Sequence, residues 1–561
     1  MPTSPRQTLV VLSDRESISD IDSLLGHVDI LNVAIGIEGG SFRVSTSLHT
    51  QTDIETQQPR HFLRNQEAML GIHLLTQLRH AAGGGAVLLR FDPNLLPLFQ
   101  RAVFEAELPF VFWADQPVVL NWKQNHVLAA ARARILTDDE LRSDWKSRYV
   151  YDVTIDETGD HLLGALTAVL DHPDPNPSPS ETDARKVLII SYFTPPAETV
   201  AVHRIAYWQS LLPEIAAENG QALEATVLTA IGDAEPRPNT LFVPDRGDIE
   251  ATQTARDLTK RIDGARVNSF ASYWSDHIRK FFKANPGYHF DAVVMSGNPF
   301  YYFDLAEDAK RMWNAEVVLD FRDPFAHNPR FVYTPPHAEL VQSLEDEYLA
   351  HADHALSVNS VCLEAIRLDD PDKGEVVANG YDERVVESVG AIPQREEDDR
   401  IAFVYSGTFF HDRRPDQFLA ALDPLQHKLI HIGRSREDDA HLDDYPSLRR
   451  YGLMPYEDVV GYCRSMDAGI IFTSGAAFEQ TTKIFDYIAT DIDIVIVTDG
   501  EPYTGELHHL TKGLEGVYWV RNEPNAIAEF IRTYRPEPRK RPNRSDYCRR
   551  AQTEKLYRLI A

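Results

Sequence analysis

Residues 478–501 read FEQTTKIFDYIATDIDIVIVTDGE, and this stretch decides how the rest of the chain is interpreted. Thr481 and Thr482 are residue types that can cap the start of a helix. The run 483–489 then predicts a short amphipathic helix, whose buried face carries Ile484, Tyr487 and Ile488. The apolar, β-branched run 494–497 predicts a strand in a parallel sheet that is covered on both faces. The stretch is therefore a helix–strand unit of an α/β domain.

The charged residues of this unit suit a nucleotide sugar. A helix start that carries Lys483 is a good site for a diphosphate, because backbone N–H groups and the helix dipole favour an anion there. Glu479 and Asp486 can accept hydrogen bonds from sugar hydroxyls. The alternative interpretation is an ordinary helix with a lysine on its surface. The pattern KIFDYIA before a strand resembles the nucleotide-sugar site of the retaining glycosyltransferases with the GT-B fold (the glycogen-synthase-like and lipopolysaccharide-type family), in which Glu usually stands where this chain has Asp486.

Length and composition limit the class of protein. The chain has 561 residues, which predicts roughly three domains. No apolar run approaches the roughly 20 residues of a membrane span, and no basic region followed by an apolar stretch opens the chain. The three cysteines are far apart, which favours neither a disulfide framework nor a metal site. We expect a cytoplasmic protein.

The net charge of −29 argues against general binding to nucleic acid. An acidic surface of this kind serves solubility or reflects a salt-adapted source.

Alternating strand and helix signals predict the domain organisation. The predicted fold class is α/β, with two Rossmann-like domains in the GT-B arrangement and an extra N-terminal Rossmann-like domain at 1–170. In that extra domain we predict strands at 8–12, 28–37, 86–91 and 110–115, and helices at 62–82 and 95–108. A Pro-, Ser- and Asp-rich linker spans 171–184. The predicted acceptor domain covers 185–392, and the predicted donor domain covers 400–535. Residues 536–561 are predicted to form a basic linker and a terminal helix, which packs back on the acceptor domain.

The second domain begins with a strand at 186–192, a loop containing FTPP and a helix at 205–218. This arrangement also resembles the glycosyltransferase family, and it implies an acceptor-side position for Thr199, His203 and Arg204. His203 is alternatively a capping or surface histidine. Further along we predict a helix at 345–354 and a strand at 355–358.

A strand at 315–320 ends in DFRDPF at 320–325, which is similar to a family pattern. Ligands of open α/β sheets bind beyond the carboxyl ends of the strands. Arg322 and Asp323 are therefore candidates for acceptor handling. The alternative is a structural Arg–Asp pair that stiffens the turn.

The third domain opens with a strand at 401–406 that runs into a small-residue turn. Gly407 lets the backbone approach a ligand closely, and Arg413 or Arg414 can neutralise a diphosphate with bidentate geometry. The resemblance implies a catalytic set and a donor-binding set in this domain. The catalytic set is Lys483, Arg413, Arg414 and Glu479, and the donor-binding set is Gly407, Thr408, Arg434, Tyr451, Met454, Thr482 and Asp486.

Two further features have competing interpretations. Asp491 and Asp493 spell the D-x-D of metal-dependent transferases, but their place before a strand favours a turn. The cluster RPEPRKRPNR at 535–544 is either a solvated linker or a contact for anionic lipid.

The first domain resembles a degenerate copy of the second. Residues 135–145 parallel 356–366 at an offset of 221, and 111–117 parallel 319–324, each a strand that ends at an aspartate near a proline. Coincidence among similar units is the alternative. A true copy lacks the counterpart of Arg322, so we expect it to be non-catalytic and to serve assembly or acceptor positioning.

Together these features predict a retaining glycosyltransferase that moves a sugar from a nucleotide-diphosphate sugar to a saccharide or lipid-linked acceptor in cell-surface polysaccharide synthesis. The resemblance implies no cofactor and no obligatory metal, because cationic side chains and a helix dipole stabilise the leaving diphosphate. We expect a cytoplasmic enzyme, with the inner membrane face as a second location. The alternatives are a sugar-nucleotide epimerase or hydrolase on the same fold, and a non-catalytic scaffold.

Overall fold

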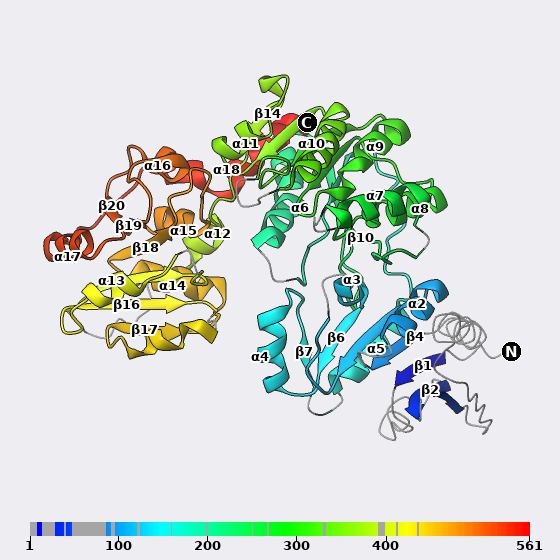
Figure 1. The fold of residues 1–561 in the computed structure, drawn as a ribbon. Coiled ribbons are helices and arrows are strands. Elements are labelled where there is room, and N and C mark those ends of the chain that lie inside the picture. Colours follow the sequence, from blue (N-terminus) through cyan, green and yellow to red (C-terminus); the bar gives the residue numbers. More distant parts are fainter. Residues whose placement is uncertain are drawn as a thin grey trace. The chain divides into compact units, whose positions relative to one another are not determined.

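The computed structural model describes the whole chain except residues 1–7, 14–28, 39–40, 48–85, 91–95, 121–123, 157, 159, 198–199, 250, 266–268, 329–332, 391–398, 411–412 and 435–436. The predicted helix at 62–82 and Thr199 lie outside the described residues. Three sheets built mainly of parallel strands, with helices between the strands, confirm the predicted α/β class (Figure 1). The chain divides into two compact units. One comprises Met1–Pro213, Gly220–Leu319 and Val332–Ala352, and the other Glu214–Asn219, Asp320–Phe331 and Asp353–Ala561.

The first sheet has the strand order β3-β2-β1-β4-β5-β6-β7. Its pairings are parallel except that of β2 with β3, which is antiparallel and was not predicted. The strands are β1 Thr8–Ser13, β2 Asp29–Glu38, β3 Ser41–Ser47, β4 Ala86–Arg90, β5 Phe110–Ala114, β6 Ala133–Leu136 and β7 Thr154–Ile155, and the helices are α2 Leu96–Ala106, α3 Asn125–Ala130, α4 Asp139–Arg148 and α5 Asp160–Asp171.

The second sheet has the strand order β10-β9-β8-β11-β12-β13-β14. Its central strand β11 is buried along its whole length, as expected for a parallel sheet with helices on both faces. The strands are β8 Arg185–Ile190, β9 Leu223–Thr229, β10 Thr240–Phe242, β11 Ala292–Ser296, β12 Glu316–Asp320, β13 His354–Ser357 and β14 Gly374–Val376. The helices are α6 Val200–Glu218, α7 Gln253–Gly264, α8 Trp274–Ala284, α9 Leu305–Trp313, α10 Pro335–Ala350, α11 Ser360–Ala365 and α12 Glu383–Ser388, with short 3-10 turns η3 Tyr301–Asp304 and η4 Pro371–Lys373.

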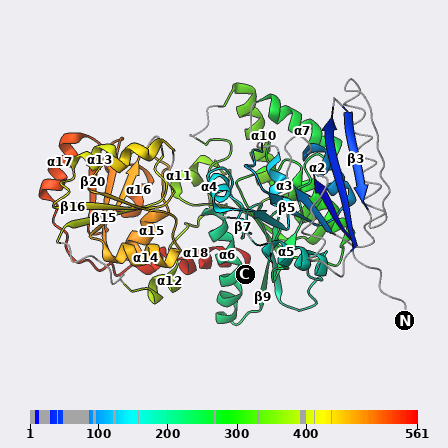
Figure 2. The ribbon, with the colours of Figure 1, turned by 90° about the horizontal axis from the view of Figure 1, so that it is seen from below.

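The third sheet has the strand order β17-β16-β15-β18-β19-β20, and all its pairings are parallel. Helices α13 and α17 cover one face, and α14 and α15 cover the other (Figure 2). The strands are β15 Ile401–Ser406, β16 His427–Ile432, β17 Leu448–Tyr451, β18 Ala468–Thr473, β19 Asp493–Thr498 and β20 Val517–Arg521. The helices are α13 Asp416–Ala421, α14 Tyr456–Ser465, α15 Lys483–Ala489, α16 Gly505–Thr511, α17 Pro524–Thr533 and α18 Arg549–Ile560, with η5 Glu437–Asp444 and η6 Arg544–Tyr547.

The first two sheets share several features, and the internal repeat stays a prediction. Their strands follow the same spatial order, and β6 corresponds to β13 at the offset of 221 residues. The helix after each of these strands begins with the same cap. Asp138 accepts a hydrogen bond from the backbone N–H of Leu141, and Asn359 accepts one from that of Cys362. The two sheets differ at one edge, where β3 is antiparallel to β2 but β10 is parallel to β9.

One predicted helix is wrong in its position. The helix expected at 345–354 is α10, which begins at Pro335 and ends at Ala350. Proline is well suited to the first turn of a helix, because the N–H groups of that turn have no partner within the helix and proline has none to leave unpaired. The sequence analysis overlooked this start signal. His354 instead begins β13.

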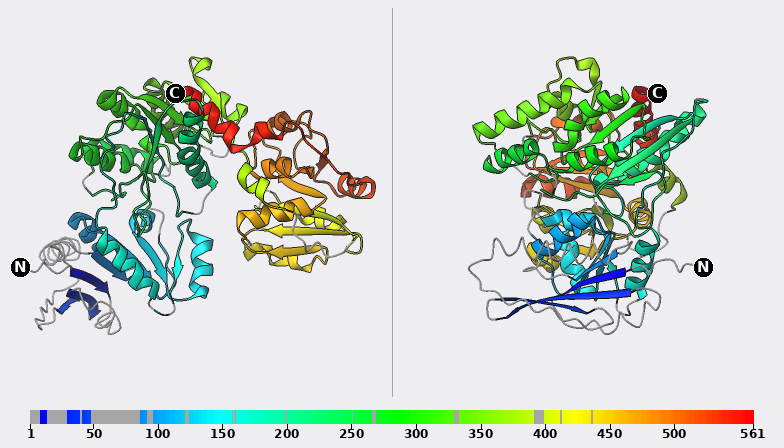
Figure 3. Two further views of the ribbon diagram at one scale, coloured as in Figure 1. Left: turned by 180° about the vertical axis from the view of Figure 1, so that it is seen from behind. Right: turned by 90° about the vertical axis from the view of Figure 1, so that its right-hand side faces the viewer.

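The basic cluster and the D-x-D sequence bind each other. Asp491 accepts hydrogen bonds from the backbone N–H of Arg541 and from the guanidinium of Arg544, each at 2.8 Å. Asp493 accepts one from Arg539 at 3.0 Å. These carboxylates therefore anchor the segment that leads to the last helix, α18, which is red in Figure 3. That helix lies against β14, where Lys555 Nζ donates to the Val376 carbonyl at 2.8 Å.

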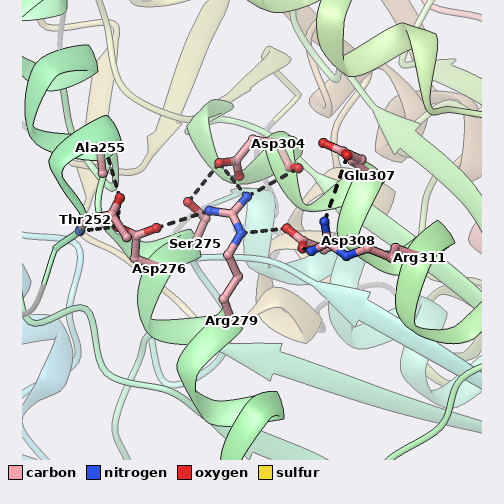
Figure 4. Close-up of polar contacts among 9 residues, drawn as sticks. All are labelled: Thr252, Ala255, Ser275, Asp276, Arg279, Asp304, Glu307, Asp308 and Arg311. Atoms are coloured by element: carbon pink, nitrogen blue, oxygen red, sulfur yellow. Dashed lines mark hydrogen bonds and ion pairs between the residues drawn. The ribbon is translucent and has the colours of Figure 1, made fainter.

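A partly buried ionic network holds the helices beside the second sheet together (Figure 4). Arg279 of α8 contacts Asp276 at 3.2 Å, Asp304 at 2.9 Å and Asp308 at 2.6 Å. Asp276 also accepts two hydrogen bonds from Thr252 ahead of α7. Burial raises the pKa of Asp304 to about 6, although Arg279 works against that shift. The network fixes the start of α8 relative to α7 and α9.

In the part of the chain that the structure describes, no helix is both long enough and apolar enough to cross a membrane. Within the same residues, Cys362, Cys463 and Cys548 are buried free thiols.

Candidate functional site

The third sheet reverses its strand order between β15 and β18. The chain proceeds from β15 to β16 on one side and returns to β18 on the other. Ligands of open α/β sheets bind outside the carboxyl ends of the strands at such a switch point. The carboxyl ends of these strands are Ser406 and Thr473. The loops that follow them, with the start of α15, contain most of the predicted catalytic residues.

Lys483 lies over the end of β15. Its ammonium nitrogen is 4.3 Å from the centroid of the Tyr405 ring. The same nitrogen is 3.3 Å from the place where a Cβ on residue 407 would stand. Gly407 has φ +131°, in a region that favours glycine, so both its conformation and its lack of a side chain keep space beside the ammonium. The predicted role of Gly407, a close approach of the backbone to a ligand, stays a prediction.

The environment of Lys483 lowers the pKa of its ammonium to about 7. Burial is the largest cause, because an enclosed ammonium loses its hydration, and the positive charge of Arg413 lowers the pKa further. The carboxylates of Asp486 and Glu479 oppose the shift but do not cancel it. The positive charges of Lys483 and Arg413 therefore favour the arrival of an anion, which would restore the charge of Lys483.

Glu479 connects Arg413 to the end of β18. Arg413 Nε lies 3.1 Å from Glu479 Oε1. The other oxygen, Oε2, accepts hydrogen bonds from the hydroxyl of Thr473 and from the backbone N–H of Ser474, the latter at 3.0 Å. Glu479 is 3% exposed. Since both of its oxygens are engaged within the protein, Glu479 acts here by holding Arg413 in place.

Asp486 faces the core of the domain. Tyr456 Oη donates to Asp486 Oδ1 at 2.5 Å, so one oxygen of this carboxylate has a partner within the protein. Burial raises the pKa of Asp486 to about 7, and the hydrogen bond from Tyr456 and the charge of Lys483 limit the rise. Asp486 thus helps to balance the charge of Lys483.

Arg414 belongs to a different cluster from its neighbour Arg413. Its guanidinium contacts Asp439 at 2.7 Å and Asp416 at 3.2 Å. His441 contacts the same Asp416 at 2.5 Å. This cluster ties η5 to the start of α13. The predicted catalytic role of Arg414 stays a prediction, and the contacts suit a residue that holds these two elements together.

Sequence reasoning missed His431. It lies in β16, is fully buried, and its ring is 4.3 Å from that of Phe409. Its Nε2 is 2.8 Å from the Gly407 carbonyl, which can only accept, so Nε2 carries the hydrogen. Burial lowers the pKa of His431, which keeps the ring neutral. The signal was a histidine inside an apolar strand, two residues before Gly433. That position is next to the carboxyl end of β16, which pairs with β15.

The remaining donor-side predictions lie along the same edge. Thr482 occupies the N-cap of α15, but its side chain makes no capping hydrogen bond, so the predicted capping role is wrong. The carbonyl of Thr408 accepts a hydrogen bond from Tyr405 Oη at 3.0 Å. Arg434 is half-buried after β16, and Tyr451 at the end of β17 is 40% exposed. Met454 packs partly buried against the core that α14 and α15 share.

The predicted acceptor-side residues have diverse surroundings. Arg204 is buried in α6, with its guanidinium carbon 4.5 Å from the centroid of the Trp208 ring. His203 is exposed, and its ring lies 6.4 Å from that of Tyr207. Arg322 and Asp323 are half-buried in the turn after β12. Their roles with an acceptor stay predictions.

Comparison with known proteins gives similarity in structure only. No protein-family model and no curated protein sequence matches the chain. A sucrose-phosphate synthase from Thermosynechococcus elongatus is similar with 12% identity and a TM-score of 0.43, over 67% of this chain and 95% of that chain. The lipopolysaccharide outer core galactosyltransferase WaaB has 13% identity and a TM-score of 0.40, over 62% and 88%. A UDP-GlcNAc 2-epimerase from Methanocaldococcus jannaschii has 10% identity and a TM-score of 0.40, over 67% and 99%.

Proposed function

We propose that this protein is a glycosyltransferase that uses a nucleotide-diphosphate sugar as its donor and a saccharide or lipid-linked saccharide as its acceptor. The observation that carries the proposal is the approach of the Lys483 ammonium to Gly407 at the switch point of the third sheet, with Arg413 held nearby by Glu479. A diphosphate beside Gly407 would meet two cations and no Cβ.

The proposed reaction breaks the bond between the anomeric carbon of the sugar and the diphosphate oxygen. The nucleoside diphosphate leaves with the bonding electrons, and Lys483 and Arg413 stabilise the negative charge that develops on it. The acceptor hydroxyl forms the new bond to the anomeric carbon from the face that the diphosphate leaves, and its proton passes to an oxygen of the leaving phosphate. We propose retention for this reason, since the step needs no side-chain base. The two side-chain cations supply the charge, so the proposal requires no metal.

Loss of one preorganised donor to a developing anion typically costs about 3 kcal/mol. Removal of Lys483 therefore slows turnover by about a hundredfold or more. Glu479 contributes indirectly, by holding Arg413, and its removal has a smaller effect on the ground-state affinity for the donor than the loss of Arg413 itself.

Turnover measurements on the full chain test this function. The protein is incubated with UDP-, GDP- and ADP-sugars, with and without a panel of saccharide acceptors, and both released nucleotide and sugar products are quantified. Nucleotide release that depends on an acceptor supports the transferase. Donor consumption without an acceptor supports the epimerase or hydrolase instead. Absence of turnover with every donor, together with absence of nucleotide binding, supports a non-catalytic scaffold.

A further inference from the structure

A cavity lies in the unit that contains the first sheet. Its volume is about 380 Å³, within the range of small-molecule sites. One wall is formed by Gln100 of α2, and by Gln124 and His126 at the start of α3. The other wall is formed by the segment after β10 and by residues of α7 and of the segment that leads into α8. The labels α2, α3, α7 and β10 in Figure 1 locate these elements.

The cavity lies beyond the carboxyl end of β10 in the second sheet and beside the amino edge of the first sheet. Asp245 and Asp248 follow β10 along the chain, and the His126 ring stacks on Phe104, which packs on Phe110 at the start of β5. Ligands of open α/β sheets bind outside the carboxyl ends of the strands. The carboxyl edge of the second sheet borders the cavity in this way, and the first sheet closes it from its amino edge.

The junction that forms the cavity is tightly packed. Arg134, which is buried, donates to the carbonyls of Leu128, Ala131 and Gly232 at 2.7 to 2.9 Å. Gly232 N donates to the Ala129 carbonyl at 2.8 Å, and a Cβ on Gly232 would stand 2.5 Å from the Ala131 oxygen. Backbone meets backbone across this contact, so the two walls are fixed relative to each other. A preformed cavity binds a ligand without the cost of ordering its walls.

His126 shows the same close fit at the cavity itself. Its ring packs on Gly247, where a Cβ would stand 2.9 Å from His126 Nε2. Gln100 Nε2 lies 2.5 Å from the same nitrogen. Gly247 has φ +62°, which favours glycine. The N-terminal sheet thus contributes an ordered polar wall to the cavity.

The lining combines hydrogen-bonding groups with aromatic rings. Side-chain amides come from Gln100 and Gln124, carboxylates from Asp248 and Asp263, and hydroxyls from serine and threonine. Phe270 and Tyr273, both half-buried, add aromatic surface. Hydroxyl groups of a sugar both donate and accept hydrogen bonds, so they match amides and carboxylates together, while the apolar face of a sugar ring suits an aromatic side chain.

The same lining disfavours the two charged classes of ligand. Among the described lining residues there is no lysine or arginine, so an anion finds no counter-charge. The carboxylates are engaged separately: Asp245 accepts from Tyr192 Oη at 3.2 Å and from Gly247 N at 3.0 Å, and Asp263 accepts from Ser269 Oγ at 2.8 Å. Within the described residues no group of three or more possible metal ligands is arranged around one point.

We propose that this cavity binds a neutral saccharide, and that the N-terminal sheet supplies Gln100, Gln124 and His126 as one wall of that site. That this saccharide is the acceptor of the reaction rests on the proposed transferase function. That the cavity binds a saccharide does not rest on it. The domain built on the N-terminal sheet then positions the acceptor. Of the two roles expected for a degenerate copy, assembly and acceptor positioning, this proposal favours the second and names a site for it.

Saccharide binding to the full chain tests the proposal. Binding of saccharides is measured by saturation-transfer NMR with methyl α-D-glucopyranoside, methyl α-D-galactopyranoside, methyl α-D-mannopyranoside, maltose and N,N′-diacetylchitobiose. Binding of charged ligands is measured in parallel by calorimetry with spermidine, calcium chloride and inorganic phosphate. The variants are Gln124→Ala and Asp263→Asn, one from each wall. Gln124 makes no side-chain capping hydrogen bond, and asparagine retains the oxygen that Ser269 contacts. The melting temperature of each variant, measured beside that of the wild type, checks that the fold is kept. The matched controls are Gln342→Ala on α10, where Gln342 is half-buried, and Asp257→Asn on α7, where Asp257 is exposed.

The proposal expects at least one saccharide to bind the wild type, and its affinity to fall about tenfold in each cavity variant and to stay unchanged in each control. Nucleotide binding, measured on the same samples, stays unchanged in all four. Saccharide binding by a chain that binds no nucleotide keeps this proposal and overturns the transferase. The proposal is overturned if no saccharide of the panel binds, if the cavity variants bind as the wild type does, or if only spermidine, calcium or phosphate binds in a manner that Asp263→Asn weakens.

Discussion

The lowered pKa of Lys483 predicts that nucleotide binding depends on pH. In the free protein the pKa is about 7, against an ordinary value of 10.5. A bound diphosphate favours the ammonium and raises this pKa, so the protein takes up a proton when it binds. Affinity is therefore fully present below about pH 7 and is lost as the pH rises from the pKa of the free protein toward that of the complex.

The size of the effect follows from these two values. If the diphosphate restores the ordinary pKa, the dissociation constant rises about 50-fold between pH 7 and pH 9, because the free protein loses the proton and the complex keeps it. At pH 8 the binding takes up about 0.9 proton, and at pH 6 only about 0.1. The window above pH 7 also avoids titration of the terminal phosphate, whose second pKa is about 6.

Calorimetric titration measures both quantities. The best-binding nucleotide is titrated at several pH values, and at each pH in two buffers with different ionisation enthalpies, so that the difference in heat gives the number of protons taken up. The control is Lys483→Met, which removes the titrating group and is expected to bind weakly without this pH dependence. An affinity that stays constant from pH 7 to pH 9, or a binding heat that is the same in both buffers, would refute the reasoning.

Four other substitutions separate binding, catalysis and stability. Gly407→Ala places a Cβ 3.3 Å from Lys483 Nζ at φ +131°, so nucleotide affinity measured by calorimetry falls at least about tenfold. Arg413→Met and Arg414→Met both lower the melting temperature, because each leaves a buried carboxylate without its arginine, but only Arg413→Met slows turnover, by about a hundredfold in a steady-state assay, while Arg414→Met leaves turnover and KM for the donor nearly unchanged. Arg134→Met leaves several buried carbonyls without a partner and lowers the free energy of unfolding by about 3 kcal/mol or more, measured by urea denaturation.

Each of these has a contrary result. Wild-type affinity in Gly407→Ala would remove the glycine from the site, and equal loss of turnover in the two arginine variants would place both arginines in it. An unchanged urea midpoint in Arg134→Met would mean that the contact between the first two sheets adds nothing to stability.

The α/β class and much of the helix–strand order could be predicted from the sequence, because local patterns determine them. The stretch 483–489 and the run 494–497 were placed within one residue of α15 and β19, since helical spacing and β-branched residues are strong signals. The start of α10 was missed where Pro335 and Pro336 mark it, and β3 was missed because its pairing with β2 is antiparallel in an otherwise parallel sheet.

The arrangement of side chains depends on contacts between distant residues, which a local pattern does not contain. Arg413 and Arg414 are adjacent, yet one contacts Glu479 and the other Asp439. Asp486 is joined to Tyr456, which lies 30 residues earlier. Only the folded chain decides which arginine faces Lys483 and which carboxylate is occupied. For the same reason the cavity beside the first two sheets had no counterpart in the sequence analysis.

The central claim is that the carboxyl edge of the third sheet binds a nucleoside diphosphate through Lys483. Calorimetric titration of UDP, GDP, ADP and CMP into the wild type, Lys483→Ala and the exposed-lysine control Lys373→Ala tests it most directly. The account predicts micromolar binding of one diphosphate to the wild type and to the control, with the affinity reduced about a hundredfold in Lys483→Ala. Binding that is equal in all three proteins, or no binding of any nucleotide, would contradict it.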